Sequence, residues 1–343
     1  MNFKNIGIWQ TAFLGDAVLT LPLLHNLSLA FPQARLSFFV RKGLGPLFEP
    51  DPGLEVLEVD KYGRDRGPGG MLRLAARIRS AGFDLWVSPH ASFRSAALAV
   101  SSGAGTRIGY DSPWFNRRAY TCTVSRRFEE LDEIERILQL LKPLNIACTQ
   151  SRPRLHLDPL AAENAREFWR EYITGPVLGV HPGAAWATKK WSGRNYAAVI
   201  DMLHAKLGIQ VMLFAGPGEE ETARGIADLV RRPDLLINLS GRLDLPSLAA
   251  FLRKLDCYLC NDSGPMHLAW VQMTPVVALF GPTTRKLGFF PRGEHSTVLE
   301  TDLECRPCGL HGPRACPREH HRCMQDITPE RVFYALKEKL RDC

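Results

Sequence analysis

The fold is decided by residues 177–206, which read VLGVHPGAAWATKKWSGRNYAAVIDMLHAK. The first four residues, 177–180, are apolar and are typical of a strand that is buried on both faces. From Tyr196 onward the apolar residues recur at helical spacing, and a loop of small residues with two lysines joins the two segments. A buried strand, a loop and a helix in this order form the repeating unit of a parallel sheet covered by helices.

The same alternation continues in both directions along the chain. Apolar runs at 6–9, 36–40, 54–59 and 85–88 precede this stretch, and runs at 210–214, 235–239, 257–259 and 275–280 follow it. A more polar stretch separates the two series, so we predict an α/β protein with two Rossmann-like doubly wound domains facing across a cleft. The expected limits are 1–157 for the N-terminal domain, 158–175 for a linker helix, 176–327 for the C-terminal domain and 328–343 for a closing helix.

Length and charge narrow the class of protein. A chain of 343 residues suits two domains of ordinary size. The net charge of +7 favours anionic partners, but the basic residues are interspersed with acidic ones, which argues against nucleic-acid binding. No apolar stretch approaches the roughly 18–20 residues of a membrane span, and the first residues do not form a signal peptide. We therefore expect a cytoplasmic protein.

The first strand is followed by Gly15 and Asp16. Ligands of open parallel sheets bind at the carboxyl ends of the strands, so chemistry is expected in the loops that begin there. Gly15 permits a tight backbone, and Asp16 is a candidate general base that the nearby helix N-terminus would keep ionised. The alternative interpretation is that Asp16 is an ordinary N-cap of the helix.

Cations follow the strand at 177–180. Gly183 lets the backbone approach a ligand, Lys189 and Lys190 supply positive charge, and Trp191 offers an aromatic plate. Such a loop suits a diphosphate group. The alternative interpretation is a solvated basic loop with a buried tryptophan.

A third group of polar residues follows the strand at 257–259. Ser263 and Gly264 would begin a helix whose N-terminus can hold an anion, and His267 would face the same space one turn further on. Asp262 could accept hydrogen bonds from ribose hydroxyls, and Thr283 in the next strand-end loop could donate to the ligand. The alternative interpretation is an ordinary helix cap.

Five segments together carry a resemblance to a known family. They are GDAVLTLP (15–22), HPGAAWATKKWSGRNYA (181–197), FAGPGEEE (214–221), NDSGPMHLA (261–269) and VALFGPT (277–283). In this order and at these intervals they resemble the ADP-heptose:lipopolysaccharide heptosyltransferases of glycosyltransferase family 9. The segment SPHASFRSA (88–96) is similar to the heptosyltransferase II branch.

The resemblance implies a GT-B fold, in which residues 1–157 form the acceptor-binding domain and residues 176–327 the nucleotide-sugar-binding domain. It also implies a specific set of residue roles. Asp16 matches the catalytic base, and Lys190 matches the lysine that contacts the donor phosphates, with Lys189 as the alternative. Asp262, Ser263, Gly264 and His267 match the nucleotide-binding segment. One of Glu219, Glu220 and Glu221 matches an acid near the ribose, and Glu221 is the first choice.

The resemblance also implies a reaction. The expected activity is inverting, metal-independent transfer of heptose from ADP-heptose to the lipopolysaccharide inner core, with no cofactor. The expected location is the inner face of the inner membrane, through peripheral contact. One alternative is a family 9 transferase with another nucleotide sugar or glycan acceptor. A non-catalytic nucleotide- or phospholigand-binding protein is the alternative from a different class.

Two further sequence features bear on these alternatives. A dinucleotide-dependent oxidoreductase should carry G-x-G-x-x-G after its first strand, and neither domain does. Four cysteines lie close together in sequence at Cys305, Cys308, Cys316 and Cys323. Thiols at such spacing suggest either a structural zinc site or free, redox-active groups, and no catalytic role is expected for them.

Overall fold

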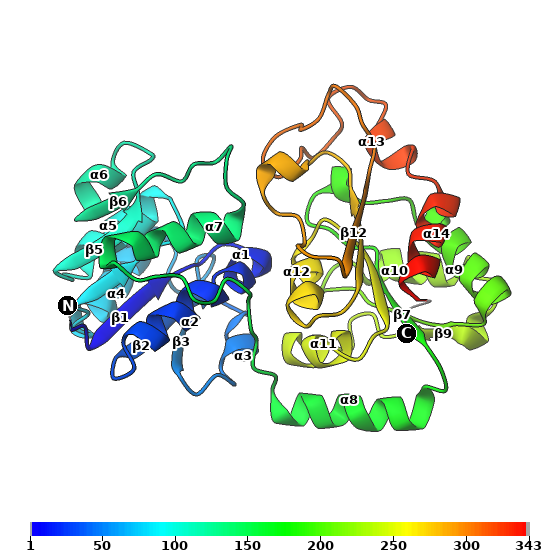
Figure 1. The fold of residues 1–343 in the computed structure, drawn as a ribbon, viewed down its shortest axis with the longest axis horizontal. Helices are drawn as coiled ribbons and strands as arrows, with labels where there is room; N and C mark the ends of the chain where they lie inside the picture. The colour runs from blue at the N-terminus through cyan, green and yellow to red at the C-terminus, as the bar shows by residue number, and fades with distance from the viewer. Residues whose placement is uncertain (1, 341–343) are drawn as a thin grey trace. The chain divides into compact units, whose positions relative to one another are not determined.

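The computed structural model describes residues 2–340 and divides the chain after His156 into two compact units (Figure 1). We refer to them as the N-terminal unit, Met1–His156, and the C-terminal unit, Leu157–Cys343. Each unit is built on one six-stranded sheet, and the strands of each sheet are parallel, as the sequence predicts. Within the described residues, no helix combines the length and the apolar character needed to cross a membrane.

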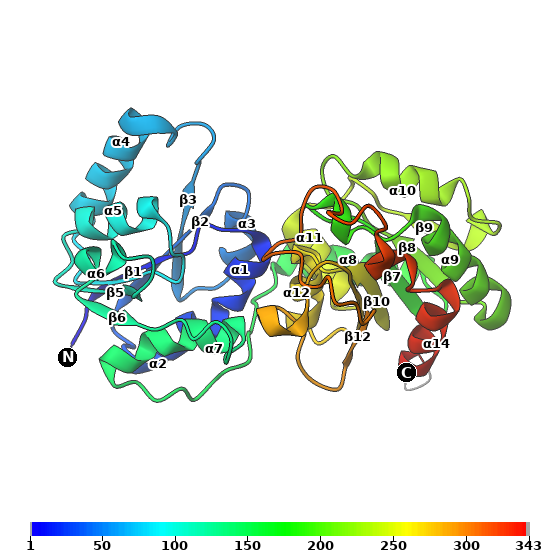
Figure 2. The same cartoon turned by 90° about the horizontal axis from the view of Figure 1, so that it is seen from above.

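The N-terminal unit has the strand order β3-β2-β1-β4-β5-β6, with every neighbouring pair parallel. Figure 2 shows α4 and α5 on one face of this sheet and α2 and α7 on the other. The strands are β1 Asn5–Trp9, β2 Arg35–Arg41, β3 Leu54–Val59, β4 Leu85–Val87, β5 Thr106–Tyr110 and β6 Cys122–Val124. The helices are α1 Leu14–Leu19, α2 Leu21–Ala30, α3 Gly45–Phe48, α4 Gly67–Ser80, α5 Phe93–Ser101, α6 Asn116–Ala119 and α7 Glu133–Leu138, followed by the 3-10 helix η1 Gln139–Leu144.

Aromatic residues fill the centre of the N-terminal unit. Trp9 on β1 packs against Phe39 on β2 and against Trp86 on β4, with ring centroids 5.6 and 6.0 Å apart. Gly7 makes room for this arrangement, because a Cβ there would lie 2.5 Å from the Trp86 ring. The packing fixes the central strands and therefore the loops that leave their carboxyl ends.

The C-terminal unit has the strand order β12-β11-β10-β7-β8-β9, again all parallel. Its strands are β7 Val177–His181, β8 Gln210–Leu213, β9 Leu236–Asn238, β10 Cys257–Asn261, β11 Val276–Phe280 and β12 Ser296–Glu300. Its α-helices are α8 Pro159–Tyr172, α9 Gly193–Leu207, α10 Glu220–Ala227, α11 Leu245–Leu252, α12 Gly264–Val271, α13 Arg322–Gln325 and α14 Pro329–Lys339. The 3-10 helices are η2 Ala187–Lys189, η3 Pro233–Leu235 and η4 Arg285–Leu287.

The stretch at 177–206 forms the strand, loop and helix that its pattern predicts, as β7 and α9. Tyr196, Val199 and Leu203 of α9 are fully buried in the main core of this unit. The chain runs from β7 to β8 and β9 on one side and then crosses to β10 on the other side of β7. The carboxyl ends of β7 and β10 therefore form the point where strand order reverses, which is where open α/β sheets bind ligands.

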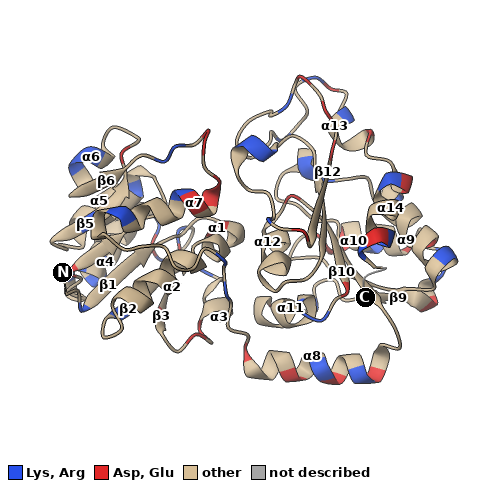
Figure 3. Cartoon of the chain, in the orientation of Figure 1, with Lys and Arg blue, Asp and Glu red and all other residues tan. Residues whose placement is uncertain are grey.

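Helix caps explain two further boundaries. The Asp158 side chain accepts from the Ala161 amide at the start of α8, and the Thr328 hydroxyl accepts from the Arg331 amide at the start of α14. These are the residues at which the sequence places the start of the linker helix and of the closing helix, and each is followed by proline at the first helical position. Figure 3 shows that α8 carries charges of both signs along its length, in keeping with its low share of buried residues.

Candidate active site

Asn261, the last residue of β10, ties together the loops of the C-terminal unit. Its side-chain amide donates to the Pro182 carbonyl at 2.7 Å, and its side-chain oxygen accepts from the Tyr196 hydroxyl at 3.0 Å. The same oxygen accepts from the Trp191 amide at 3.3 Å. Because this side chain is fully buried, its bonds hold the loop after β7 against the end of β10.

Lys189 and Asp262 form a buried ion pair at this junction. The Lys189 ammonium lies 2.5 Å from the Asp262 Oδ2 atom, and the Thr283 hydroxyl donates to the same oxygen at 2.7 Å. The side chains of Lys189 and Asp262 are 11% and 7% exposed. Asp262 thus fixes a cation and a hydroxyl from two other loops. The role of Asp262 as an acceptor for ribose hydroxyls stays a prediction.

Lys190 lies in the loop after β7, and Glu219 lies in the loop after β8. Burial would raise the pKa of Glu219, but the hydrogen bond from His181, the charge of His181 and the charge of Lys190 hold it below its ordinary value. The Glu219 Oε2 atom lies 3.2 Å from His181 Nε2, and His181 Nδ1 lies 2.9 Å from the Tyr258 hydroxyl. The partly exposed Lys190 therefore acts on an ionised glutamate at the edge of the sheet.

The structure separates the three candidate glutamates. Glu219 precedes α10 and also accepts from the Gly216 amide at 3.2 Å. Glu221 is exposed on α10, and Glu220 accepts from the Gly218 amide at 2.8 Å. A Cβ at Gly183 would lie 2.0 Å from Glu219 Oε2, so the missing side chain is what admits this carboxylate. Glu219, not the first choice Glu221, is therefore the glutamate that lies with His181 and Lys190 at the carboxyl ends of the strands. We call these three residues, together with Lys189 and Asp262, the strand-end cluster.

Two buried polar atoms lie beside α12, and within the described residues they have no hydrogen-bond partner. They are the hydroxyl of Ser263, the N-cap residue, and the Nδ1 atom of His267. Burial lowers the pKa of His267 to about 4, with an opposing effect of Asp262, so this imidazole is neutral at pH 7. Buried polar atoms without partners are uncommon in folded proteins, and together with Gly264 at the helix N-terminus they suit an anionic ligand.

Trp191 is a structural residue, which corrects one expectation. It is 4% exposed, packs edge-on against Tyr196 with ring centroids 5.0 Å apart, and donates to the Ile327 carbonyl at 2.9 Å. The buried tryptophan of the alternative interpretation is confirmed and the aromatic plate is wrong, but the loop is not the solvated one of that alternative, because Lys189 is also buried. The physical reason is that the indole ring packs in the apolar core, where its N–H also has a partner in the Ile327 carbonyl.

Asp16 in the N-terminal unit lies within α1 rather than at its cap. The N-cap is Phe13, and the Phe13 amide donates to Asp16 Oδ2 at 3.1 Å. The N-cap alternative for Asp16 is therefore wrong, because the helix begins two residues earlier, at Leu14. Gly15 is buried within the same helix, so it forms no separate turn.

Desolvation raises the pKa of Asp16 to about 6, and the charge of Glu133 adds to this effect. The Phe13 amide and the charge of Arg126 oppose it. The prediction that the helix N-terminus would keep Asp16 ionised left out burial, which raises the pKa by more than the Phe13 amide lowers it. At pH 7 the carboxylate still exceeds the acid form roughly ten to one, which is suitable for a general base.

The charges that act on Asp16 belong to an ion-pair network that sequence reasoning missed. Arg126 Nη2 lies 2.8 Å from both carboxylate oxygens of Glu133, and Arg136 Nη1 lies 3.0 Å from Glu133 Oε2. Glu133 and Arg136 are nearly fully buried. No motif marks these residues. The only sequence signal is the cluster of acidic and basic residues around the start of α7.

The comparisons with known proteins agree with this geometry. Residues 71–314 match the model of glycosyltransferase family 9 (heptosyltransferase). The chain belongs to glycosyltransferase family 9. This family 9 enzyme is 25% identical to the lipooligosaccharide heptosyltransferase 2 of Campylobacter jejuni over 341 residues, which cover 98% of each chain.

Two solved structures show that the family 9 enzyme has the GT-B fold. The family 9 glycosyltransferase of Veillonella parvula superposes with a TM-score of 0.90 at 24% identity, over 100% of this chain and 99% of that one. The ADP-heptose lipopolysaccharide heptosyltransferase II of Escherichia coli superposes with a TM-score of 0.79 at 22% identity, over 99% of each chain. The GT-B architecture predicted from the sequence is confirmed.

The cysteines of the family 9 enzyme lie on a segment that contacts the loops at the carboxyl ends of β7 and β11. Cys305, Cys308, Cys316 and Cys323 are free thiols, and within residues 2–340 no three His, Cys, Asp or Glu side chains are arranged to hold a metal ion. The Cys308 amide donates to the Pro282 carbonyl at 2.8 Å, and His321 Nε2 lies 2.8 Å from the Thr188 carbonyl. The segment thus contacts and supports two strand-end loops. Zinc binding by the four cysteines stays a prediction.

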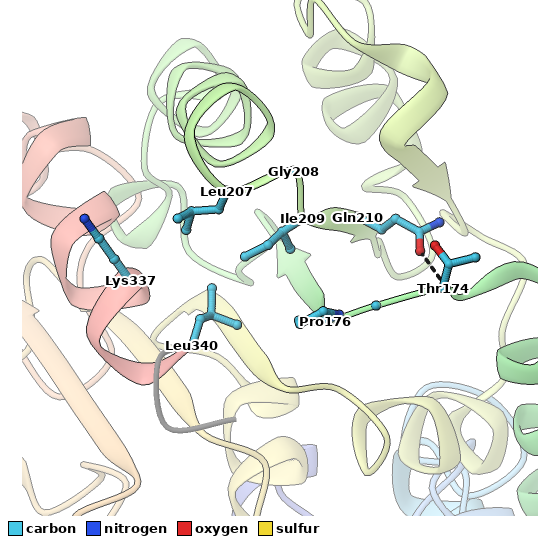
Figure 4. A pocket seen from close by; sticks show the side chains of 9 residues that line it. Thr174, Pro176, Leu207, Gly208, Ile209, Gln210, Lys337 and Leu340 are labelled. Atoms are coloured by element: carbon cyan, nitrogen blue, oxygen red, sulfur yellow. Dashed lines mark hydrogen bonds between the residues drawn. The ribbon is translucent and has the colours of Figure 1, made fainter.

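A cavity of about 260 Å³ in the C-terminal unit lies at the opposite edge of the sheet from these loops (Figure 4). Thr174, Leu207, Lys337 and Leu340 are among its lining residues, close to the amino ends of β7 and β8. Ligands of parallel sheets bind at the carboxyl ends, so this cavity is not part of the candidate active site.

Proposed function

We propose that this enzyme transfers heptose from ADP-heptose to a hydroxyl of the lipopolysaccharide inner core, with inversion at the anomeric carbon and without a metal ion. The similarity to the lipooligosaccharide heptosyltransferase of Campylobacter jejuni and the ADP-heptose lipopolysaccharide heptosyltransferase of Escherichia coli supports the donor and the acceptor class. The observation that carries the proposal is Asp16, an aspartate in a family 9 chain whose pKa is raised to about 6.

Asp16 is the proposed base. Its carboxylate would take the proton of the acceptor hydroxyl as the oxygen forms a bond to the anomeric carbon. The bond from that carbon to the diphosphate breaks on the opposite face, and ADP leaves with the electron pair. Such a transition state resembles an oxocarbenium ion, and attack opposite to the leaving group inverts the configuration.

The donor loops are proposed to stabilise the leaving diphosphate. Lys190 would face the phosphate oxygens, while Lys189 is held by Asp262 and contributes mainly to the local field. One lysine about 4 Å from a phosphate oxygen is worth ~4 kcal/mol at an effective dielectric near 20, and a helix N-terminus adds up to ~2 kcal/mol. Ser263, Gly264, His267 and Thr283 would complete the anion site. These charges would take the place of a metal ion.

Glu219 is proposed to hold the ribose of the donor. It is ionised, it lies beside Lys190, and its contacts with His181 and Gly216 fix its position. Glu221 remains the alternative from the family resemblance. We also propose that the enzyme works at the cytoplasmic face of the inner membrane through peripheral contact, since its acceptor is a glycolipid and its donor a nucleotide sugar.

A donor screen tests the proposal. Release of nucleotide from ADP-heptose, UDP-sugars and GDP-sugars is measured with a heptose-deficient core as acceptor, with and without a chelator, and the product anomer is assigned by NMR. We expect turnover with ADP-heptose but not with UDP-sugars or GDP-sugars, and we expect the chelator to leave the rate unchanged. A preference for another donor, retention of configuration or loss of activity on chelation would each refute part of the proposal.

The variant Asp16→Asn separates an enzyme from a binding protein. We expect it to lose at least a hundredfold in kcat while ADP affinity, measured by calorimetry, stays unchanged, because a base acts only on the reacting hydroxyl. Ser192→Ala, outside the proposed donor contacts, serves as a control. Unchanged turnover in Asp16→Asn would remove Asp16 from the mechanism.

A further inference from the structure

The helices α4, α5 and α6, which cover one face of the N-terminal sheet, carry positive charge only. In this layer α5 lies between α4 and α6 and contacts both (Figure 1 and Figure 2). On the opposite face of the sheet, α7 contains Glu133 and Glu135. The three helices of the layer contain no aspartate or glutamate, and their basic residues are Arg73, Arg77, Arg79, Arg94, Arg117 and Arg118. Charge of one sign is therefore concentrated on one face of the unit.

All of these arginines except the half-buried Arg94 are exposed to solvent. In the part of the chain that the structure describes, only Arg117 among them forms an ion pair, with Asp111 at 3.9 Å, and the Arg117 side chain is 72% exposed. Arg73 donates to the Arg64 carbonyl at 2.8 Å, a contact that leaves its charge uncompensated. Exposed cations without acidic partners attract an anionic surface.

The solvent-facing side of α4 has an apolar strip between its arginines. Leu74 and Ile78 are buried in the aromatic core of the unit. An α-helix turns by roughly 100° per residue, so Leu72 and Ala76 lie on the opposite side of the helix, and both are exposed. The arginines of α4 lie along both sides of this strip. An apolar strip flanked by cations is typical of a helix that lies in the headgroup region of a membrane.

Three large apolar side chains are exposed on the same layer of helices. Leu72 is 71% exposed, Val100 near the end of α5 is 53% exposed, and Trp114, which precedes α6, is 73% exposed. Arg118 lies over the Trp114 ring, 5.9 Å from its centroid. Tryptophan is enriched where proteins meet the headgroups of a bilayer. We call the surface formed by Leu72, Arg73, Ala76, Arg77, Arg79, Val100, Trp114, Arg117 and Arg118 the arginine face.

We propose that the arginine face binds the anionic phospholipid headgroups of a membrane surface. Its arginines attract the lipid phosphates, and Leu72, Val100 and Trp114 are apolar side chains that can enter the headgroup layer. The inference rests on the proposed function in one respect, namely that the acceptor is a glycolipid held in the same membrane.

The position of α4 relates this surface to the proposed base. β1 and β3 belong to one parallel sheet, so α1, which contains Asp16, and α4 both begin near its carboxyl edge. Leu72 lies in the second turn of α4 and is therefore close to that edge. A membrane contact at this end of α4 would bring the sugars of a membrane-held acceptor to the edge of the sheet that carries Asp16.

A bilayer fits the arginine face better than a nucleic acid does. Binding to nucleic acid without sequence preference depends on contacts between cations and phosphates. Such contacts give no reason for Leu72 and Val100 to be exposed among the arginines. Binding to a membrane surface uses apolar side chains and cations together. The apolar part of the arginine face therefore favours a lipid surface.

The test measures binding of the full chain to vesicles without donor or acceptor. Vesicles of phosphatidylcholine alone are compared with vesicles of phosphatidylcholine mixed with phosphatidylglycerol. Bound protein is measured by co-sedimentation at low and at high ionic strength. One variant combines Arg73→Gln with Arg77→Gln, and a second variant carries Leu72→Gln.

Helix α8 of the C-terminal unit offers matched controls. Arg166 and Arg170 have the same spacing as the two exchanged arginines of α4, and their side chains are 60% and 79% exposed. The first control therefore combines Arg166→Gln with Arg170→Gln. Leu160 is 69% exposed on the same helix, so Leu160→Gln is the control for Leu72→Gln.

We expect the parent protein to bind the anionic vesicles, more weakly at high ionic strength, and not the neutral ones. A basic residue near an anionic surface contributes about fivefold in affinity, so the double arginine variant should bind about 20-fold more weakly. Leu72→Gln should weaken binding at both ionic strengths, and the α8 variants should bind like the parent protein. Every variant should keep the parent Tm and the parent turnover with a deacylated acceptor, because the exchanged side chains face solvent.

Two results with vesicles would overturn the proposal. One is equal binding of the parent protein to neutral and anionic vesicles, and the other is unchanged vesicle binding by the double arginine variant. A DNA duplex serves as the second probe. Loss of duplex binding in the double arginine variant, with vesicle binding retained, would also overturn the proposal and make the arginine face a nucleic-acid site.

Failure of this inference differs from failure of the proposed function. If the donor screen gives no heptose transfer while the variants of the arginine face lose vesicle binding, the proposed reaction is wrong and the membrane contact stands. If heptose transfer proceeds while these variants bind vesicles like the parent protein, the reaction stands and the membrane contact is wrong.

Discussion

The buried carboxylate of Asp16 should make the N-terminal unit less stable at neutral pH than at acid pH. Its pKa rises from 3.8 to about 6 in the folded state, so the folded protein binds a proton between these values where the unfolded chain does not. Stability therefore falls as pH rises from about 4 to about 6 and then stays at the lower level. Asparagine cannot ionise, so Asp16→Asn should remove this loss.

The size of the effect follows from the shift in pKa. One pKa unit corresponds to about 1.4 kcal/mol, so a shift from 3.8 to about 6 corresponds to about 3 kcal/mol at pH 8. This is an upper limit, because part of the Asp16 side chain remains accessible to water. The Asn side-chain oxygen can still accept from the Phe13 amide, so the helix start is kept. For a unit of 156 residues, the corresponding rise in Tm is at most about 6–12 °C.

Calorimetric melting of the parent protein and of Asp16→Asn from pH 4 to pH 8 checks this prediction. The variant should melt at higher temperature at pH 8, and the difference should disappear toward pH 4, where both side chains are neutral. Asp111→Asn, at a partly exposed aspartate paired only with Arg117, is the control. A difference in Tm that does not vary with pH, or a less stable variant at pH 8, would refute the assignment of a raised pKa to Asp16.

Two other perturbations test the site. Glu133→Gln removes a negative charge that raises the pKa of Asp16. The acid limb of the pH profile of kcat/KM, expected near pH 6 in the parent protein, should therefore move to lower pH by up to about one unit. An unchanged acid limb would mean that Asp16 does not control it. The same variant leaves Arg126 and Arg136 without their buried partner and should lower stability by about 3–5 kcal/mol in denaturant unfolding. Glu219→Gln should weaken ADP binding about tenfold in calorimetry, whereas Glu221→Gln should leave it unchanged, because only Glu219 lies in the strand-end cluster. If Glu221→Gln weakens ADP binding and Glu219→Gln does not, Glu221 is the ribose contact.

The central strands could be predicted from sequence because a strand buried on both faces leaves a continuous apolar run. β7, β10 and β11 are of this kind, and every residue in each of them is buried. β6 has only three residues and an exposed middle position, and α7 has six residues, so neither produces a clear periodic pattern. These two short elements therefore escaped prediction.

The position of the candidate site could be predicted, but its internal pairing could not. The strand-end rule places Lys189, Asp262 and Glu219 in the correct loops of one sheet. Which lysine pairs with Asp262 depends on a contact between residues 73 positions apart, and the choice of Glu219 depends on its contact with His181, 38 positions away. Local patterns carry no information on such contacts, and so Trp191 was assigned to the ligand rather than to the core.

Gly183 sets a limit on how this enzyme can be redesigned. The carboxylate of Glu219 occupies the volume in which any other residue would place its first side-chain carbon. Loop grafts intended to change the donor specificity must therefore exchange positions 183 and 219 together. A graft that brings even alanine to position 183 would displace Glu219 from His181 and the Gly216 amide, and its effect on catalysis would be misread as a change in substrate preference.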